Sequence, residues 1–220
     1  MDENGDAHNA RNGDSATAGR PRTQKERREK AERRMLQAAV GVLAEKGFAG
    51  LTLNQVGEAA GYSRGLPTHY FGRKDELLAA MARFIVERFI KGMQLSQVPG
   101  TGEGLAAVQS ATDYYLESVA RDPTTMRALL VILTEATSHP DLFPAIIELN
   151  RSSVERISRL IRIGQAKGEI RAEIDPDAQA VLILGQLRGV AGHWLSDPQT
   201  INIDQIRAAF RQSLERSLRP

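Results

Sequence analysis

Apolar side chains recur every three or four positions through most of the chain, which is the period of an α-helix. No segment alternates between apolar and polar residues over the length of a β-strand. Gly47 follows the first clear apolar stripe, in the position where a glycine commonly ends a helix. That stripe consists of Met35, Leu36, Ala39, Val40 and Leu43. The pattern therefore predicts an all-α protein.

Caps and helix breakers divide this pattern into about nine helices. Thr52, with Gln55 three residues later, has the sequence of a capping box and opens a helix that ends before Gly61. Ser63 is expected to cap a short helix from Arg64 to Phe71, with a proline at the edge of its first turn. Glycines and X-Pro pairs separate the further helices, which are expected at about 75–96, 104–121, 123–138, 140–167, 176–195 and 203–218.

Composition narrows the class of protein. The chain has 220 residues and no cysteine, which excludes disulfides and thiolate metal sites and fits a reducing cytoplasm. Residues 1–22 are polar and without periodicity, so we expect a disordered tail and no signal peptide. The most apolar stretch, 128–133, is too short to cross a bilayer. We expect a cytoplasmic protein with no membrane partner.

The formal net charge is only +2, but basic residues are concentrated near the first predicted helix. Glu26, Glu29 and Glu32 are the acidic residues among them. Such a segment favours a polyanionic partner. The alternative is a solvated helix face with intrahelical ion pairs. The basic residues are Arg20, Arg22, Lys25, Arg27, Arg28, Lys30, Arg33 and Arg34.

The segment from Thr52 to Phe71 is predicted as a helix, a tight glycine turn and a short second helix. This arrangement presents the second helix to the major groove of DNA. Its residues offer donors for phosphates and base edges, one apolar group for a thymine methyl, and a glycine that allows close approach. His69 is alternatively a residue that packs or caps locally. The residues are Ser63, Arg64, Gly65, Leu66, Thr68, His69 and Tyr70.

The run from Leu51 to Leu78 resembles the DNA-binding signature of the tetracycline-repressor (TetR) family. Thr52 and apolar residues, then Ala-Gly-Tyr-Ser, a glycine, His-Tyr-Phe and Lys-Asp-Glu-Leu follow at the family's spacing. The upstream Ala-Ala and Gly-Phe of the first helix match too. Two residues depart from the pattern: Pro67 replaces an apolar residue, and Thr68 replaces a frequent tyrosine.

The resemblance implies a homodimer that binds double-stranded operator DNA through three N-terminal helices. It implies phosphate contacts from Thr52, Tyr70 and Lys74. Arg64, Leu66 and Thr68 would face base edges or flanking phosphates. A basic arm containing Arg22 and Lys25 would enter the minor groove, with simple phosphate steering as the alternative. The implied domains are 23–72 for DNA binding and 73–220 for effector binding and dimerisation.

The penultimate predicted helix has three glycines on one side. Interior glycines cost about 1 kcal/mol each relative to alanine, so a close approach between helices is a reasonable compensation. The family resemblance favours a dimer interface with the last helix, whereas the alternative is ordinary packing inside one subunit. The interface candidates are Val181, Leu182, Gly185, Arg188, Gly189, Gly192, Ile206 and Phe210.

A pocket for a small-molecule effector is expected among the middle helices, where apolar residues and a few polar groups occur together. For each residue the alternative is a place in the core. No cofactor is expected. The candidate lining residues are Tyr114, Tyr115, Met126, Leu130, Phe143, Ile147, Gln186, His193 and Trp194.

These features predict a transcriptional repressor that leaves a near-palindromic operator when an effector binds. The alternative is a helical DNA-binding or architectural protein without an effector. Enzymatic activity is disfavoured because the histidines, at His8, His69, His139 and His193, lack metal-ligand spacing and have no nucleophile or paired carboxylates beside them.

Overall fold

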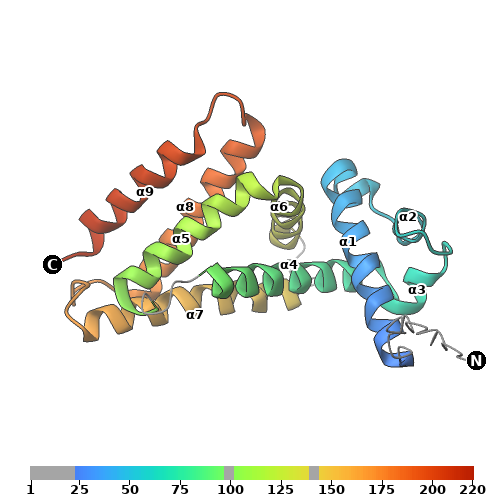
Figure 1. Cartoon of the computed structure of the whole chain (residues 1–220), viewed down its shortest axis with the longest axis horizontal. Helices are drawn as coiled ribbons and strands as arrows, with labels where there is room; N and C mark the ends of the chain where they lie inside the picture. Colours follow the sequence, from blue (N-terminus) through green and yellow to red (C-terminus); the bar gives the residue numbers. More distant parts are fainter. Residues whose placement is uncertain (1–22, 97–101, 139–143) are drawn as a thin grey trace, which may run out of the picture.

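The computed structural model describes residues 23–96, 102–138 and 144–220 (Figure 1). Within them the chain forms nine helices and no strand, which confirms the all-α prediction. Arg22, Phe143 and the predicted tail lie outside the described residues. The helices are α1 (Gln24–Gly50), α2 (Leu53–Ala59), α3 (Leu66–Phe71), α4 (Lys74–Ser96), α5 (Gly104–Arg121), α6 (Pro123–Ser138), α7 (Pro144–Ala166), α8 (Pro176–Ser196) and α9 (Ile203–Leu218).

The first three helices begin and end largely where the sequence indicates. The predicted capping box of α2 is present, since the Thr52 hydroxyl accepts from the Gln55 amide and the Gln55 side chain accepts from the Thr52 amide. Gly47 has a φ of 66° and breaks the regular helix of α1. The third helix differs from the prediction. It starts at Leu66 with Gly65 as N-cap, and no side chain caps it.

This later start explains how the helix accommodates Pro67. As the second helical residue, Pro67 occupies a position whose N–H has no acceptor within the helix, so the missing donor costs nothing there. The Ser63 cap predicted from the sequence was wrong. The backbone carbonyl of Ser63, and not its side chain, accepts a hydrogen bond from the Leu66 amide.

Two hydrophobic cores meet through α6. The first joins α1–α4 to Ala128, Ile132 and Ala136 of α6, all of them buried. The second joins α5, α7, α8 and α9, and Met126 at the start of α6 belongs to it. Figure 1 shows α4 leading from the small helices at the N-terminal end to this larger body. The division into 23–72 and 73–220 stays a prediction, and the first core crosses it.

The ends of the later helices follow their capping residues. At the end of α7, the Glu169 and Gly168 amides donate to the carbonyls of Gly164 and Gln165, and Gly168 has a φ of 68°. These bonds define a Schellman motif. The sequence placed the start of α7 at residue 140, whereas the described helix begins at Pro144. None of the described helices has the length and apolar character that crossing a membrane would require.

Candidate DNA-binding surface and effector cavity

The turn between α2 and α3 holds the two helices close together. Gly61 has a φ of 71°, a conformation that favours glycine. A Cβ atom on Gly57 would lie 2.6 Å from the carbonyl oxygen of Ser63, so little space remains where α2 meets the turn. The tight crossing fixes the direction in which α3 projects from the molecule. Gly57 was not among the residues singled out from the sequence.

The side chains predicted to face DNA form one exposed surface around α3. Thr52 at the start of α2 is exposed, while Leu66 and Tyr70 are half-buried against the first core. The Tyr70 ring lies below the Arg28 guanidinium, 5.5 Å from its central carbon, so the basic N-terminal part of α1 adjoins this surface. The other exposed members are Ser63, Arg64, Gly65, Thr68 and His69.

Arg64 projects from the turn with its side chain 75% exposed and pairs with Glu58 of α2, the Nε–Oε1 distance being 2.5 Å. This carboxylate therefore competes with any anion that approaches the guanidinium. Arg73, just after α3, is also exposed and pairs with Asp75. The hydrogen bond between them raises the pKa of Arg73 and lowers that of Asp75.

Two of the predicted DNA contacts have surroundings that the sequence did not indicate. Lys74 is half-buried: its Nζ donates to the Phe48 carbonyl and lies 3.9 Å from the centre of the Phe48 ring. Burial lowers the pKa of this lysine. A phosphate contact by Lys74 stays a prediction, and it requires the ammonium group to leave Phe48.

Lys25 is the second of these residues. It lies in the first turn of α1 and is exposed, 4.0 Å from Glu29. An α-helix with side chains is about 10–12 Å wide and cannot enter a minor groove about 6 Å wide. A minor-groove contact would have to come from the Lys25 side chain alone, reaching from the end of the helix, and both this contact and phosphate steering stay predictions.

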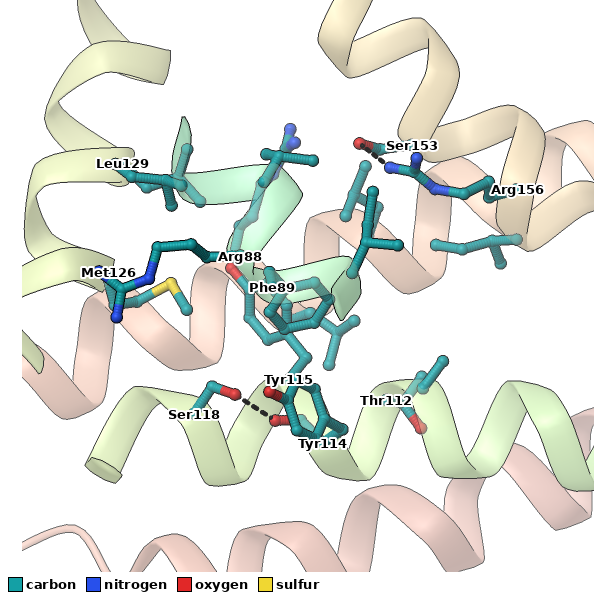
Figure 2. Close-up of a pocket in the computed structure, with 18 of the residues that line it drawn as sticks. Arg88, Phe89, Thr112, Tyr114, Tyr115, Ser118, Met126, Leu129, Ser153 and Arg156 are labelled. Carbon is teal, nitrogen blue, oxygen red and sulfur yellow. Dashed lines mark hydrogen bonds between the residues drawn. The ribbon is translucent and has the colours of Figure 1, made fainter. Parts of the chain in front are cut away.

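A cavity of about 440 Å³ lies between α4, α5, α6, α7 and α8. Figure 2 shows Phe89 of α4 beside Tyr114 and Tyr115 of α5, with Ser153 and Arg156 of α7 across from them. The ring centres of Phe89 and the two tyrosines are 5.1 and 5.7 Å apart. Most of the remaining wall is apolar and includes residues from all five helices. The volume is in the range of sites for small organic molecules.

The predicted ligand residues divide between several places. Tyr114, Tyr115 and Met126 line the cavity. Leu130 and Ile147 instead line an adjoining hollow of about 510 Å³. The rest of the described candidates lie outside both spaces: Gln186 and His193 are exposed, and Trp194 is half-buried against the second core.

Five arginines line the cavity, against a single acidic residue, Asp122. The Asp122 carboxylate accepts from the Thr125 amide at the start of α6. Among the described residues, only Arg121 of the five has a carboxylate within ion-pair distance, that of Glu117 at 3.3 Å. The other four are Arg88, Arg156, Arg159 and Arg188.

Arg156 and Arg188 are the half-buried members of this group. Burial lowers the pKa of both guanidinium groups, and repulsion from Arg159 lowers that of Arg156 further. Among the described residues their hydrogen bonds go to neutral oxygens: Arg156 donates to Ser153 Oγ at 3.4 Å and Arg188 to Asn150 Oδ1 at 2.7 Å. The charges of Arg156 and Arg188 are thus not neutralised by an ion pair with any described residue.

The sequence did not lead us to predict Arg156 as a lining residue, and Arg188 was predicted to lie in the dimer interface. Arg188 lines the cavity, but it also lines the adjoining hollow together with Gly189 and Gly192, so its place in the dimer interface stays a prediction. A signal was present for Arg188. It follows buried Leu184 by four residues and precedes buried Ala191 by three, so it borders the apolar side of α8. An arginine beside an apolar stripe indicates that its guanidinium group contacts a polar group or a ligand inside the protein.

The opposite side of α8 is open. Val181 and Leu182 are 56% and 59% exposed, which is unusual for large apolar residues at adjacent positions. A Cβ atom added to Gly185, Gly189 or Gly192 would meet no atom of the described residues within 4 Å. Within the described part of one subunit, no helix packs closely against these glycines, as the alternative of ordinary packing inside one subunit would require. Ile206 and Phe210 of α9 are half-buried.

Comparisons with known proteins agree with this architecture. The family described as bacterial regulatory proteins, tetR family, matches residues 35–81, and the family described as BetI-type transcriptional repressor, C-terminal, matches residues 105–219. The HTH-type transcriptional regulator PksA of Bacillus subtilis (strain 168) is 25% identical over 190 residues, which cover 85% of this chain and 89% of PksA.

Solved structures share the fold. A TetR-family transcriptional regulator from Rhodococcus sp. superposes with a TM-score of 0.76 at 22% identity, over 84% of this chain and 97% of that chain. A transcriptional regulator from Saccharomonospora viridis in complex with choline has a TM-score of 0.70 at 18% identity, over 86% and 98% of the two chains. Family match, helix order and the exposed helix-turn-helix surface agree, and they point to a regulator family and not to enzymes. The chain belongs to the TetR family of transcriptional regulators.

Proposed function

We propose that this regulator is a homodimeric repressor that binds a near-palindromic operator and leaves it when a small molecule occupies the 440 Å³ cavity. As a DNA-binding regulator it would act in the cytoplasm, where bacterial DNA lies. Each subunit would place α3 in a major groove, and the two-fold axis would set the half-sites about one helical turn, or 34–36 Å, apart.

The proposal rests on the position of α6 between the cavity and the DNA-binding helices. Met126, Leu129 and Leu133 of α6 line the cavity. On the neighbouring face of the same helix, Ala128 and Ile132 are fully buried in the core that holds α1. Cores are close-packed and deform little. An effector that moves α6 must therefore also move α1 or lose packing.

A second connection runs through α4, which follows α3 after only two residues. Arg88 of α4 lines the cavity and donates to the Gln37 side chain of α1 at 3.3 Å. Phe89, its neighbour, packs on both cavity tyrosines. Two helices thus reach from the cavity to the DNA-binding part. Ligand binding would favour a conformation with a different spacing of the two α3 helices, which is a population shift.

On the DNA side, we infer phosphate contacts from Thr52 and Tyr70 and base or phosphate contacts from Arg64, Leu66 and Thr68. These side chains lie on one surface and all but Leu66 and Tyr70 are exposed. Half or more of the hydrogen bonds in such interfaces go to the sugar-phosphate backbone of DNA and position the protein, whereas contacts to base edges select the sequence. Arg64 is the best candidate for selection because it can bind guanine in a bidentate manner.

The dimer interface is inferred to include α8. The exposed Val181 and Leu182 and the open glycine face form an apolar surface that no described segment of the same subunit covers. A second copy related by two-fold symmetry would bring α8 against α8, where glycines permit a close approach. Isologous contacts of this kind are the usual form of dimers. The half-buried Ile206 and Phe210 of α9 would border the same surface.

The test begins with selection of operator DNA from a random pool by the full chain. A near-palindromic consensus is expected. Arg64→Ala and Tyr70→Ala should weaken binding of the selected duplex, whereas Arg151→Ala, an exposed arginine of α7, is the matched control. Unchanged binding by both α3 variants would refute the assigned surface. Binding without sequence preference would favour the architectural alternative.

A further inference from the structure

The wall of the cavity has a charge pattern that bears on the chemistry of its ligand. The aromatic and apolar residues call for an apolar body. In the wall, Arg156 of α7 and Arg188 of α8 are both half-buried, and within the described residues their hydrogen bonds go to Ser153 and Asn150 and not to a carboxylate. Partly desolvated cations without a counter-charge are costly, and such groups in native proteins are normally paired.

A second observation supports a missing anionic partner. Tyr115 lines the same cavity and is 8% exposed, and its hydroxyl oxygen is buried beside the cavity with no hydrogen-bond partner among the described residues. Burial raises the pKa of this phenol to about 12, with Arg188 acting in the opposite direction, so the hydroxyl stays protonated and is a donor near physiological pH. Buried polar atoms without a partner are rare, and each requires an explanation. An acceptor on a ligand supplies one.

We propose that the effector is an amphipathic organic anion, with an apolar body against Phe89 and the tyrosines and an acidic head group held by Arg156, Arg188 and the Tyr115 hydroxyl. The inference rests on the proposed role of this cavity and specifies its ligand class. Guanidinium groups bind carboxylate and phosphate through charge-assisted hydrogen bonds. Both head groups fit this chemistry, and the test below distinguishes them.

A cationic ligand is disfavoured by the same wall. The five arginines outnumber the single acid, Asp122. The Tyr114 ring also has the Arg121 guanidinium 4.9 Å from its centre, so this aromatic face already has a cation over it. Quaternary ammonium groups require open aromatic faces or carboxylates. Asp122 is the one carboxylate in the described part of the wall, and its Oδ1 already accepts from the Thr125 amide.

The decisive comparison needs no variant. Four probes of equal chain length, decanoate, decyl phosphate, decanol and decyltrimethylammonium, are titrated into the full-length wild-type protein by calorimetry. We expect one anion per subunit, bound at least tenfold more tightly than decanol, and no binding of the cation. The better of the two anions identifies the head group. Equal or tighter binding of decanol or of the cation, or binding of none of the four, would overturn the proposal.

Variants then locate the head group. Arg156→Met and Arg188→Met should each weaken anion binding tenfold or more and leave decanol unaffected. Arg151→Met, on the exposed side of α7, is the matched control and should bind as the wild type does. A purely structural arginine would lower the melting temperature when replaced. Here we expect Arg188→Met to melt at or above the wild-type temperature without ligand, because it removes an unpaired, partly buried cation.

Failure of this inference is separable from failure of the proposed function. Operator binding by the ligand-free protein and its loss in Arg64→Ala concern the DNA-binding surface alone. If those results hold and the anions do not bind, only the ligand class is wrong. If anions bind at Arg156 and Arg188 without releasing operator DNA, the ligand class stands and the repressor mechanism fails.

Discussion

The ion pair between Arg64 and Glu58 leads to a prediction in the unusual direction, a gain of DNA affinity from a substitution on α2. Glu58→Gln removes the carboxylate that the guanidinium contacts at 2.5 Å. Both side chains are largely exposed, at 75% and 49%, so their pair is worth about 0.5 kcal/mol, the middle of the range for such pairs. A dimer breaks two pairs on binding. The variant should therefore bind the operator about fivefold more tightly.

The salt dependence shows whether Arg64 itself carries this effect. Each phosphate neutralised contributes about 0.9 to the slope of log K against log salt. If Arg64 neutralises one phosphate in each subunit, Arg64→Ala should flatten the slope by about 1.8 in the dimer, whereas loss of a guanine contact would change the slope less. Between 50 and 200 mM salt a change of about 1.8 corresponds to about a tenfold smaller loss of affinity than in the wild type. Fluorescence anisotropy of a labelled operator duplex over this range measures both quantities.

A double-mutant cycle completes the argument. In the Arg64→Ala background, Glu58→Gln should change affinity little, because the competing cation is gone. Glu155→Gln, an exposed glutamate of α7, is the control for loss of one negative charge. If Glu58→Gln tightens binding equally with and without Arg64, general repulsion from DNA explains the effect. If it does not tighten binding at all, Arg64 does not contact DNA.

Three further outcomes check the fold on which these sites depend. Gly168→Ala should lower the melting temperature by about 2–4 °C, since a left-handed residue other than glycine costs about 1 kcal/mol net. Gly41→Ala should raise the melting temperature by a similar amount, because Gly41 lies inside α1 with open space around it and alanine favours the helix. Ile132→Ala should cost about 2–5 kcal/mol in urea unfolding and Ile132→Val no more than about 1.5, because this side chain is fully buried between α1 and α6. Leu182→Glu should yield monomers in light scattering at concentrations where the wild type is dimeric; a stable dimer would place the interface elsewhere.

The helices and the DNA-binding segment were predictable because their information is local. The capping box at Thr52 and the glycines at Gly47, Gly61 and Gly168 determine chain direction within a few residues, and each acts as expected. The one local error concerned the start of α3. A serine before a helical stretch suggests a cap, but Pro67 fits the first turn only when the helix begins at Leu66.

The cavity was less predictable because it depends on the contacts between five helices. Periodicity separates an inner from an outer side of each helix, but it does not say which inner residues meet one another and which border empty space. Tyr114 and Tyr115 were found through their residue type, whereas Gln186 and His193 proved to be exposed. Arg188 was assigned to the dimer interface together with its neighbours on the same helix, because the sequence does not show that its side chain borders the cavity.

The same arginines bear on how the cavity can communicate with DNA. A ligand shifts a conformational equilibrium only through a difference in its affinity for the two states. An apolar body alone gains similar burial wherever the helices stand. A head group held by Arg156 of α7 and Arg188 of α8 depends on the distance between two helices, so its binding energy differs between conformations that differ in that distance. Because α6 packs on both α7 and α8 as well as on α1, the state that brings the two guanidinium groups to one anion is also the state that can change the position of α1.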